Sequence, residues 1–187
     1  MSTIEDIGVA IAARIRRERE AKGWSLGDLA AQAGVSKAML SKVERGEASP
    51  TAVILSRIAA AFGLTLAALV EQTTDQPRML RARDQPVWRD PRTSYLRRQI
   101  FLSPANPLEL VEIELPPRQQ VSFPASVYLL VRHVVWVLSG ELEITEGRDS
   151  HRLAAGDRLE FGAPIDTTFR NDGAQACRYV VAVLRIR

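Results

Sequence analysis

The stretch SLGDLAAQAGVSKAMLSKVERG, residues 25–46, has the pattern of two short helices joined by a tight turn. Ser25 and Asp28 have the spacing of a capping box, in which each side chain accepts a hydrogen bond from the other residue's backbone N–H. Gly34 stands where the chain must reverse, a position that suits a residue able to adopt positive φ. Ser36 is placed to cap the second helix. The stretch therefore predicts a helix–turn–helix unit.

The second of these helices has two contrasting faces. Leu40 and Val43 lie three residues apart on one face, which we expect to be buried. The opposite face is short, polar and cationic. It carries Lys37, Ala38, Ser41, Lys42 and Arg45. Because short polar side chains reach base edges in the DNA major groove and cations meet phosphates, such a face is typical of a helix that reads DNA.

Three motifs define a wider pattern: Arg-x-x-x-Gly-Trp-Ser at 19–25, Leu-Ala-x-x-x-Gly-Val-Ser at 29–36, and Leu-Ser-x-Val-Glu-Arg-Gly at 40–46. Together they resemble the helix-turn-helix of the lambda-repressor-like (XRE) family, from about residue 11 to 70. The resemblance implies an all-α five-helix DNA-binding domain. It also implies a buried ion pair between Arg19 and Glu44. In the pattern that follows, Ser49 and Pro50 are expected to begin the fourth helix, with Ser49 as its cap.

We expect seven residues to contact DNA. Those facing bases are Lys37, Ala38, Ser41 and Lys42, and those nearer phosphates are Ser36, Arg45 and Lys22. Proteins resembling this family generally dimerise, which predicts a homodimer on a palindromic operator in double-stranded DNA. A compact helical bundle with a solvated cationic face is the simpler alternative, and the three motifs together disfavour it.

Composition sets further bounds on the 187 residues, which are enough for one large or two small domains. The net charge of +3 permits nucleic-acid binding, and all three lysines fall in the first quarter of the chain. A single cysteine, Cys177, excludes an intramolecular disulfide and a cysteine-based zinc site. The longest apolar run, residues 127–138, is too short for a membrane span, so we expect a cytoplasmic protein with no membrane partner.

The domain organisation follows from a change of period. Residues 1–72 carry the helical pattern, and residues 73–93 read as a linker with scattered prolines and five arginines. This linker is either a solvated tether or a tether that adds phosphate contacts. From residue 94 to 187 the period is two, and a hairpin signal lies around Ser139-Gly140. Many short strands with regular turn signals predict an all-β sandwich or barrel.

The second half carries VLSGELEI at 137–144 and HRLAAGDRL at 151–159. With Gly162-Ala163-Pro164 and Arg170-Asn171, these segments resemble a cupin, which implies a double-stranded β-helix, or jelly-roll, barrel. Metal-binding cupins carry three histidines and a glutamate. The matching positions here hold Ser126, Tyr128, His133 and Thr167. Because a divalent metal needs three or four convergent ligands, the sequence predicts no catalytic metal and no cofactor.

The same positions, together with Trp136, form the predicted ligand site. Its residues are Ser126, Tyr128, His133, Trp136 and Thr167. His133 is alternatively an interior histidine with a structural role, because buried polar groups cost stability unless they are paired. The sequence shows no nucleophile–base motif, phosphate loop or dinucleotide fingerprint, so we expect no catalytic residues and no enzyme.

These features predict a transcriptional regulator whose cupin domain dimerises and senses a small molecule. Two alternatives stay open. One is a metal-dependent cupin oxygenase or epoxidase that carries a helix-turn-helix domain. The other is a regulator whose cupin is only a dimerisation module.

Overall fold

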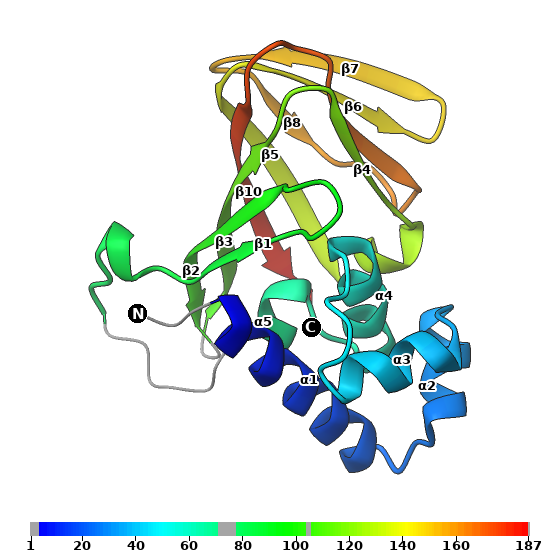
Figure 1. The fold of residues 1–187 in the computed structure, drawn as a ribbon. Coiled ribbons are helices and arrows are strands. Elements are labelled where there is room, and N and C mark those ends of the chain that lie inside the picture. The colour runs from blue at the N-terminus through cyan, green and yellow to red at the C-terminus, as the bar shows by residue number, and fades with distance from the viewer. Residues whose placement is uncertain (1–3, 71–77, 104–105, 187) are drawn as a thin grey trace. The chain divides into compact units, whose positions relative to one another are not determined.

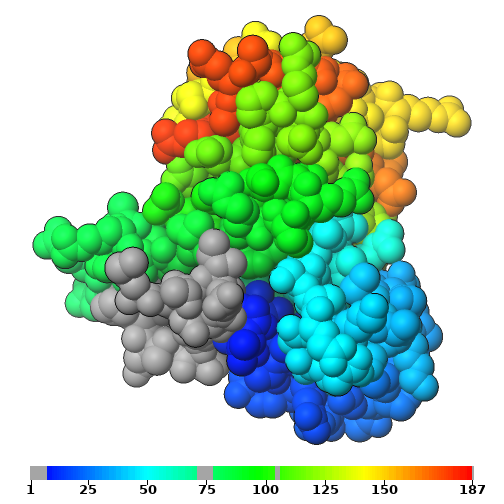
Figure 2. Space-filling model, viewed as in Figure 1, coloured from blue at the N-terminus to red at the C-terminus, as the bar shows by residue number. Residues whose placement is uncertain are grey.

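The computed structural model describes the backbone of residues 4–70, 78–103 and 106–186, and side chains from Gly8 onward. The chain divides into two compact units, Met1–Thr74 and Asp75–Arg187, and each is described by itself. Figure 1 shows their helices and strands. In the space-filling view of Figure 2 the first unit runs from blue to cyan and the second from green to red.

Residues 4–70 form five α-helices, as the sequence predicts. They are α1 (Ile4–Ala21), α2 (Leu26–Ala33), α3 (Lys37–Glu44), α4 (Ala52–Phe62) and α5 (Leu66–Val70). The fully buried side chains include Ile15 of α1, Leu29 of α2, Leu40 of α3 and Leu55 of α4. Because each helix contributes an apolar stripe to one shared core, the unit holds together although two of the helices have only eight residues.

The helix ends follow the predicted caps with one exception. Ser25 and Asp28 form the capping box of α2, and Gly34 ends that helix in the left-handed region at φ 61°. The cap of α4 is Thr51, whose hydroxyl accepts from the Ile54 backbone N–H, so the assignment of Ser49 is wrong. A hydroxyl three residues before a free N–H decides the cap. Because α4 begins at Ala52, Thr51 lies three residues before Ile54 and has that spacing.

The second unit consists of two antiparallel sheets. One sheet has the order β1 (Val87–Arg89), β2 (Leu96–Ser103), β3 (Asn106–Leu115), β10 (Cys177–Arg185), β5 (Val131–Ser139) and β8 (Arg158–Glu160). The other has the order β4 (Gln119–Phe123), β9 (Thr167–Asn171), β6 (Glu141–Glu146) and β7 (Asp149–Ala154). Short 3-10 helices, η1 (Ala82–Asp84) and η2 (Ala125–Tyr128), precede β1 and β5.

The strand order identifies the fold of this unit. From β3 to β10 the chain changes sheet at every connection except that between β6 and β7, which are paired in the smaller sheet. The two interleaved sets, β3-β10-β5-β8 and β4-β9-β6-β7, are those of an eight-stranded double-sheet jelly roll. The predicted jelly roll is therefore confirmed, and β1 and β2 extend its larger sheet.

The core of the jelly roll lies between the sheets, where inward side chains alternate along each strand. Val111 and Ile113 of β3 and Leu142 and Ile144 of β6 are all buried. The turn before β6 requires glycine, because a Cβ at Gly140 would lie 3.0 Å from Cys177 Cα and φ is +80°.

The segment expected to be a linker differs from that expectation in its later part. Strand β1 pairs with β2 through Trp88 and Arg97, and Trp88 packs edge-on against Tyr95 at 6.3 Å between ring centroids. A strand of three residues is too short to show a period in the sequence. Residues 73–77 of the expected linker lie outside the described residues. None of the described helices is long and apolar enough to span a membrane.

Candidate functional site

Helix α3 is fixed by its inner face and leaves its outer face in solvent. Leu40 and Val43 are buried in the helical core. The Ser36 hydroxyl accepts from the Met39 backbone N–H at 3.2 Å and so caps the helix. The turn before it is held from α4, because Arg57 donates to the Gly34 carbonyl at 3.3 Å. These contacts set the orientation of α3 against α2.

A buried ion pair ties α1 to the end of α3. Arg19 donates to the Glu44 carboxylate through two parallel bonds of 2.7 and 2.8 Å, and its third bond, of 2.9 Å, goes to the Trp24 carbonyl. The two side chains are only 13% and 8% exposed. The hydrogen bond to Glu44 raises the pKa of Arg19. The pair that the family resemblance implies is therefore confirmed.

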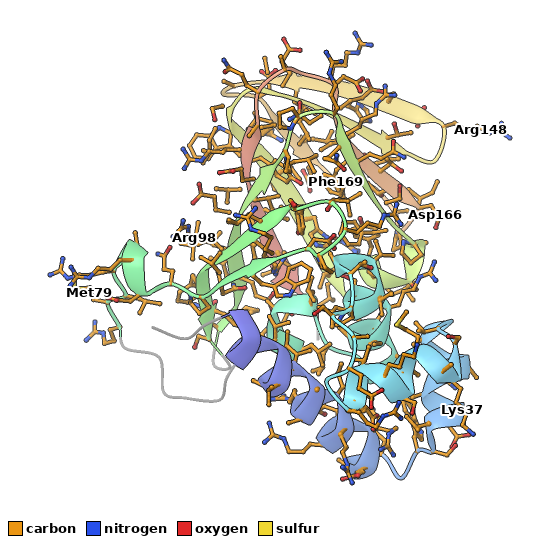
Figure 3. All side chains as sticks on the ribbon, in the orientation of Figure 1. Lys37, Met79, Arg98, Arg148, Asp166 and Phe169 are labelled. Carbon is orange, nitrogen blue, oxygen red and sulfur yellow. The ribbon has the colours of Figure 1, made fainter. Side chains whose placement is uncertain are left out.

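The residues predicted to face DNA differ in their solvent exposure and in their hydrogen bonds within the protein. Lys37, Ala38 and Lys42 are exposed, and Figure 3 labels Lys37 at the first turn of α3. Ser41 is half-buried, and its hydroxyl accepts a bond from Arg45. Free cations and a small side chain therefore occupy the middle of the outer face.

The cationic groups predicted to lie nearer phosphates have partners within the protein. Arg45 donates to both oxygens of Glu47, at 2.6 and 2.7 Å, and this pairing holds the pKa of Glu47 below its usual range. The Lys22 ammonium lies 5.2 Å from the ring centroid of Trp24, in a cation–π arrangement. A phosphate must therefore compete with Glu47 for Arg45, whereas Lys22 keeps its charge available.

The interior of the jelly roll gathers three of the five predicted ligand residues. Tyr128 at the end of η2 contacts His133 of β5, with ring centroids 5.2 Å apart. Thr167 at the start of β9 is buried and donates to the Ile165 carbonyl at 3.1 Å. Burial raises the pKa of Tyr128, and a side-chain hydrogen bond with Thr167 opposes that rise.

The other two predicted ligand residues lie elsewhere. Trp136 is 51% exposed, and its neighbours Val135 and Val137 point into the core. Because side chains alternate along a strand, Trp136 faces away from the interior, contrary to the inward position that the family spacing predicts for it. Ser126 is also exposed. It lies in η2, where the period of two that the family spacing assumes does not hold.

An aromatic row that the sequence analysis missed fills much of the interior. From His133 it continues to Phe161, Phe169 and Tyr179, with successive ring centroids 5.7, 5.8 and 5.9 Å apart. Phe169, labelled in Figure 3, lies between the two sheets. Phe169 and Tyr179 each stand at an inward position of a strand with period two. That alternation is the signal that could have found them.

Comparison with known proteins bears on both units. The helix-turn-helix family (HTH_3) matches residues 15–69. The HTH-type transcriptional regulator SutR of Escherichia coli is 26% identical over 179 residues, covering 94% of this chain and 95% of that protein. The HTH-type transcriptional regulator SinR of Bacillus subtilis is 31% identical over 94 residues, covering 49% of this chain and 85% of that protein. The chain belongs to the HTH-type transcriptional regulators.

A solved structure extends the likeness to the whole regulator. The crystal structure of an HTH_3 family transcriptional regulator from Vibrio cholerae matches with a TM-score of 0.82 and 25% identity, covering 99% of this chain and 100% of that one. The regulator thus shares its two-unit architecture with a protein of the same class. The XRE-type helix-turn-helix predicted from the sequence is confirmed.

The described part of the regulator contains no group of three or more His, Cys, Asp or Glu side chains placed to hold a metal ion. A surface hollow of about 350 Å³ lies along β6 and β7, and its lining includes Glu143, Arg152 and Asp172. None of the five predicted ligand residues lines this hollow.

His133 gives the jelly roll a pH dependence. Burial, with a smaller contribution from the charge of Arg97, lowers the pKa of His133 from 6.5 to about 4. Above pH 6.5 the ring is neutral in both the folded and unfolded states. Between pH 6.5 and 4 the unfolded chain binds a proton that the folded regulator does not, so stability falls by about 3 kcal/mol in total. Urea unfolding at a series of pH values measures this loss.

The control for this prediction is His133→Phe, which keeps an aromatic ring in contact with Tyr128 and Phe161. The variant should lose stability less steeply than the wild type between pH 6.5 and 4, because it has no ring to protonate. Equal slopes in the two proteins would contradict the assignment.

Proposed function

We propose that the regulator binds its operator through the outer face of α3, as a homodimer, and that the jelly roll senses a small molecule. The observation that carries the DNA-reading role is the arrangement of α3 itself. Its apolar face is buried, its helix start is capped, and its opposite face exposes Lys37, Ala38 and Lys42. A rigid helix with short and cationic side chains outward is the form that enters a major groove.

The proposed contacts follow the exposure of each group. Lys37, Ala38, Ser41 and Lys42 are proposed to face bases. Ser36, Arg45 and Lys22 are proposed to lie nearer phosphates, with Arg45 the weakest contributor because Glu47 already engages its guanidinium. Ser36 has a backbone role as the cap of α3, so only its remaining lone pair and its hydroxyl proton are free for DNA.

The proposed dimer uses the outer face of the larger sheet. In the register of β10 and β5, Val180 stands beside Trp136, and Ala182 stands beside Val134. Trp136 is 51% exposed and Leu184 is 47% exposed. A row of apolar side chains open to solvent on a flat sheet favours burial against another surface. A second copy of the same face would cover it with two-fold symmetry.

Sensing acts by linkage in this proposal. A small molecule in the jelly roll changes operator affinity only if it binds one arrangement of the regulator more tightly than another. Catalysis is not part of the proposal. The similar proteins that cover nearly the whole chain are named as transcriptional regulators, and the cupin resemblance assigns Ser126, Tyr128 and Thr167, rather than histidines, to the metal-ligand positions of its motifs. Because the proposed partner is double-stranded DNA, we infer a cytoplasmic protein.

A second candidate role for the jelly roll is dimerisation alone. The aromatic row from Tyr128 through His133 and Phe161 to Tyr179 favours it, because rings that contact one another occupy part of the interior with the protein's own side chains. Binding of small molecules to the interior distinguishes the two roles.

The test of the DNA-reading role is a selection from random duplex DNA with the full-length protein at moderate salt. We expect enrichment of a palindromic site whose half-sites lie about one helical turn apart, because two recognition helices related by a two-fold axis meet the groove at that spacing. Enrichment of no sequence, with and without added small molecules, would contradict the proposal.

The matched variant is Trp136→Glu, which places a charge on the proposed dimer face. Trp136 stands beside Arg158 of β8, so a glutamate is tolerated in the folded unit. Sedimentation should show a dimer for the wild type and a monomer for the variant. The selection should then recover a single half-site with weaker enrichment. A variant that stays dimeric would place the interface elsewhere.

A further inference from the structure

Arg97 is a cation on the inner face of the larger sheet. In β2 it stands opposite Ile113 of β3, which is buried in the core, and opposite Trp88 of β1. Its neighbour Arg98 points the other way, toward Glu112 on the outer face, at 3.6 Å. The alternation of the strand therefore sends Arg97 inward and Arg98 outward.

Among the described residues, Arg97 has no acidic partner. Its Nε is buried and has no hydrogen-bond partner. In the described part of the chain, no carboxylate lies within ion-pair distance of its guanidinium. The acid on the same face, Glu109, pairs with Arg185 at 3.5 Å. The guanidinium shares a side-chain hydrogen bond with Tyr95, which is neutral, so its charge has no counter-ion among the described residues. Buried charges are normally paired with an opposite charge, so this arrangement requires an explanation.

The groups around Arg97 are neutral hydrogen-bonding rings. Tyr95 and Tyr179 are buried beside it, and burial raises the pKa of both hydroxyls while Arg97 opposes the rise. His133 is also within the field of Arg97 and is neutral at pH 7. The interior thus presents one positive charge among donors and acceptors without charge. Because the Arg97 side chain as a whole is only half-buried, the site is open to solvent on one side.

Gln99 adds a second unsatisfied group two residues along the same face, opposite Val111. Its Nε2 donates to the Phe101 carbonyl at 2.8 Å and to the Leu110 carbonyl at 3.2 Å. These bonds fix the orientation of the amide and leave Oε1 buried without a partner. Gln99 Oε1 is therefore a hydrogen-bond acceptor of fixed orientation, two residues along the same face from Arg97.

We propose that the jelly roll binds a small carboxylate, with both oxygens on the Arg97 guanidinium and a hydroxyl or amino group of the ligand donating to Gln99 Oε1. The planar guanidinium matches a carboxylate through two parallel bonds. Trp88 and Tyr95 supply an aromatic wall for the body of the ligand. This inference rests on the proposed sensing role and names the chemical class of its effector.

The test is calorimetric titration of the full-length regulator with four probes and no DNA. Lactate and phenyllactate carry a carboxylate and a hydroxyl, phenylpropionate lacks the hydroxyl, and phenylpropanediol lacks the carboxylate. We expect phenyllactate to bind most tightly and the diol not to bind. Loss of a hydrogen bond to a charged group should weaken binding roughly tenfold to a hundredfold, so Arg97→Gln should lose that much affinity for phenyllactate.

The matched control is Arg98→Gln, which removes the same charge from the neighbouring outward position and should change phenyllactate affinity by less than about twofold. Arg97→Lys keeps the charge without the two-pronged geometry and should retain part of the affinity. The inference is overturned if neither lactate nor phenyllactate binds the wild type, if the diol binds as well as phenyllactate, or if Arg97→Gln binds as the wild type does.

A second measurement separates this inference from the proposed function. Operator affinity is compared with and without saturating phenyllactate. Arg97-dependent binding that shifts operator affinity supports both the site and the sensing role. Arg97-dependent binding without a shift supports the site and contradicts sensing. Operator binding by a regulator that takes up none of the carboxylates contradicts the site and leaves DNA reading intact.

Discussion

Glu44→Ala should destabilise the helical unit by about 3–5 kcal/mol, because it removes one partner of a buried ion pair and leaves the other charge buried. Arg19 would keep its bond of 2.9 Å to the Trp24 carbonyl and a longer ion pair of 3.7 Å with the exposed Glu20, with 13% of its own side chain exposed to water. A loss of this size is a large part of the stability of a small domain. Urea unfolding followed by circular dichroism in the helix band measures it.

The matched control is Glu20→Ala on the same helix as Arg19. Glu20 pairs with Arg16 at 2.8 Å and more weakly with Arg19 at 3.7 Å. The Arg16 and Glu20 side chains are 64% and 51% exposed, so water replaces the lost partner, and Arg19 keeps its two bonds to Glu44. The control should unfold at nearly the wild-type urea concentration. If Glu44→Ala and Glu20→Ala unfold alike, the buried pair does not hold α1 to α3.

A double variant tests the physical reason for this effect. Arg19→Met combined with Glu44→Leu removes both charges and leaves apolar side chains of similar length. Since desolvation offsets much of the attraction within a buried pair, the double variant should recover most of the stability that Glu44→Ala loses. A double variant as unstable as Glu44→Ala would show that loss of the hydrogen bonds between Arg19 and Glu44, rather than the buried and uncompensated charge of Arg19, causes the destabilisation.

The helical unit was predictable from the sequence because its signals are local. The capping box of Ser25 and Asp28, the left-handed turn at Gly34 and the buried pair of Leu40 and Val43 each depend on residues three or four positions apart. Such spacings are visible in the chain itself. The Arg19–Glu44 pair spans 25 residues and came from the family resemblance rather than from any local pattern.

The jelly roll was predictable as a class of fold but not in its interior. Turns such as the one at Gly140 mark the hairpins, whereas β1, with three residues, is too short to show a period. The inward direction of Trp136 was wrongly inferred from family spacing, although alternation from Val135 and Val137 places it outside. Arg97 could not be identified from the sequence, because its lack of a counter-ion depends on which residues the other strands bring near it.

Lys42→Ala should lower the affinity for the selected operator roughly tenfold to a hundredfold and leave binding to unrelated DNA much less changed. Lys42 is exposed on the outer face of α3, between buried residues that hold the helix in place. Its ammonium has no ion pair in the described part of the chain, so it meets DNA without first breaking a contact. Binding isotherms on operator and scrambled duplexes measure the ratio.

Lys22→Ala is the comparison that separates base reading from phosphate contact. Lys22 lies beyond the end of α1, with its ammonium over the Trp24 ring, away from the middle of the recognition face. Removing a phosphate contact should weaken operator and scrambled DNA by similar factors, and should reduce the slope of log affinity against log salt by about one. Lys42→Ala should instead change mainly the ratio between the two duplexes. If both variants weaken both duplexes equally, the outer face of α3 contacts the DNA backbone and some other element reads the bases.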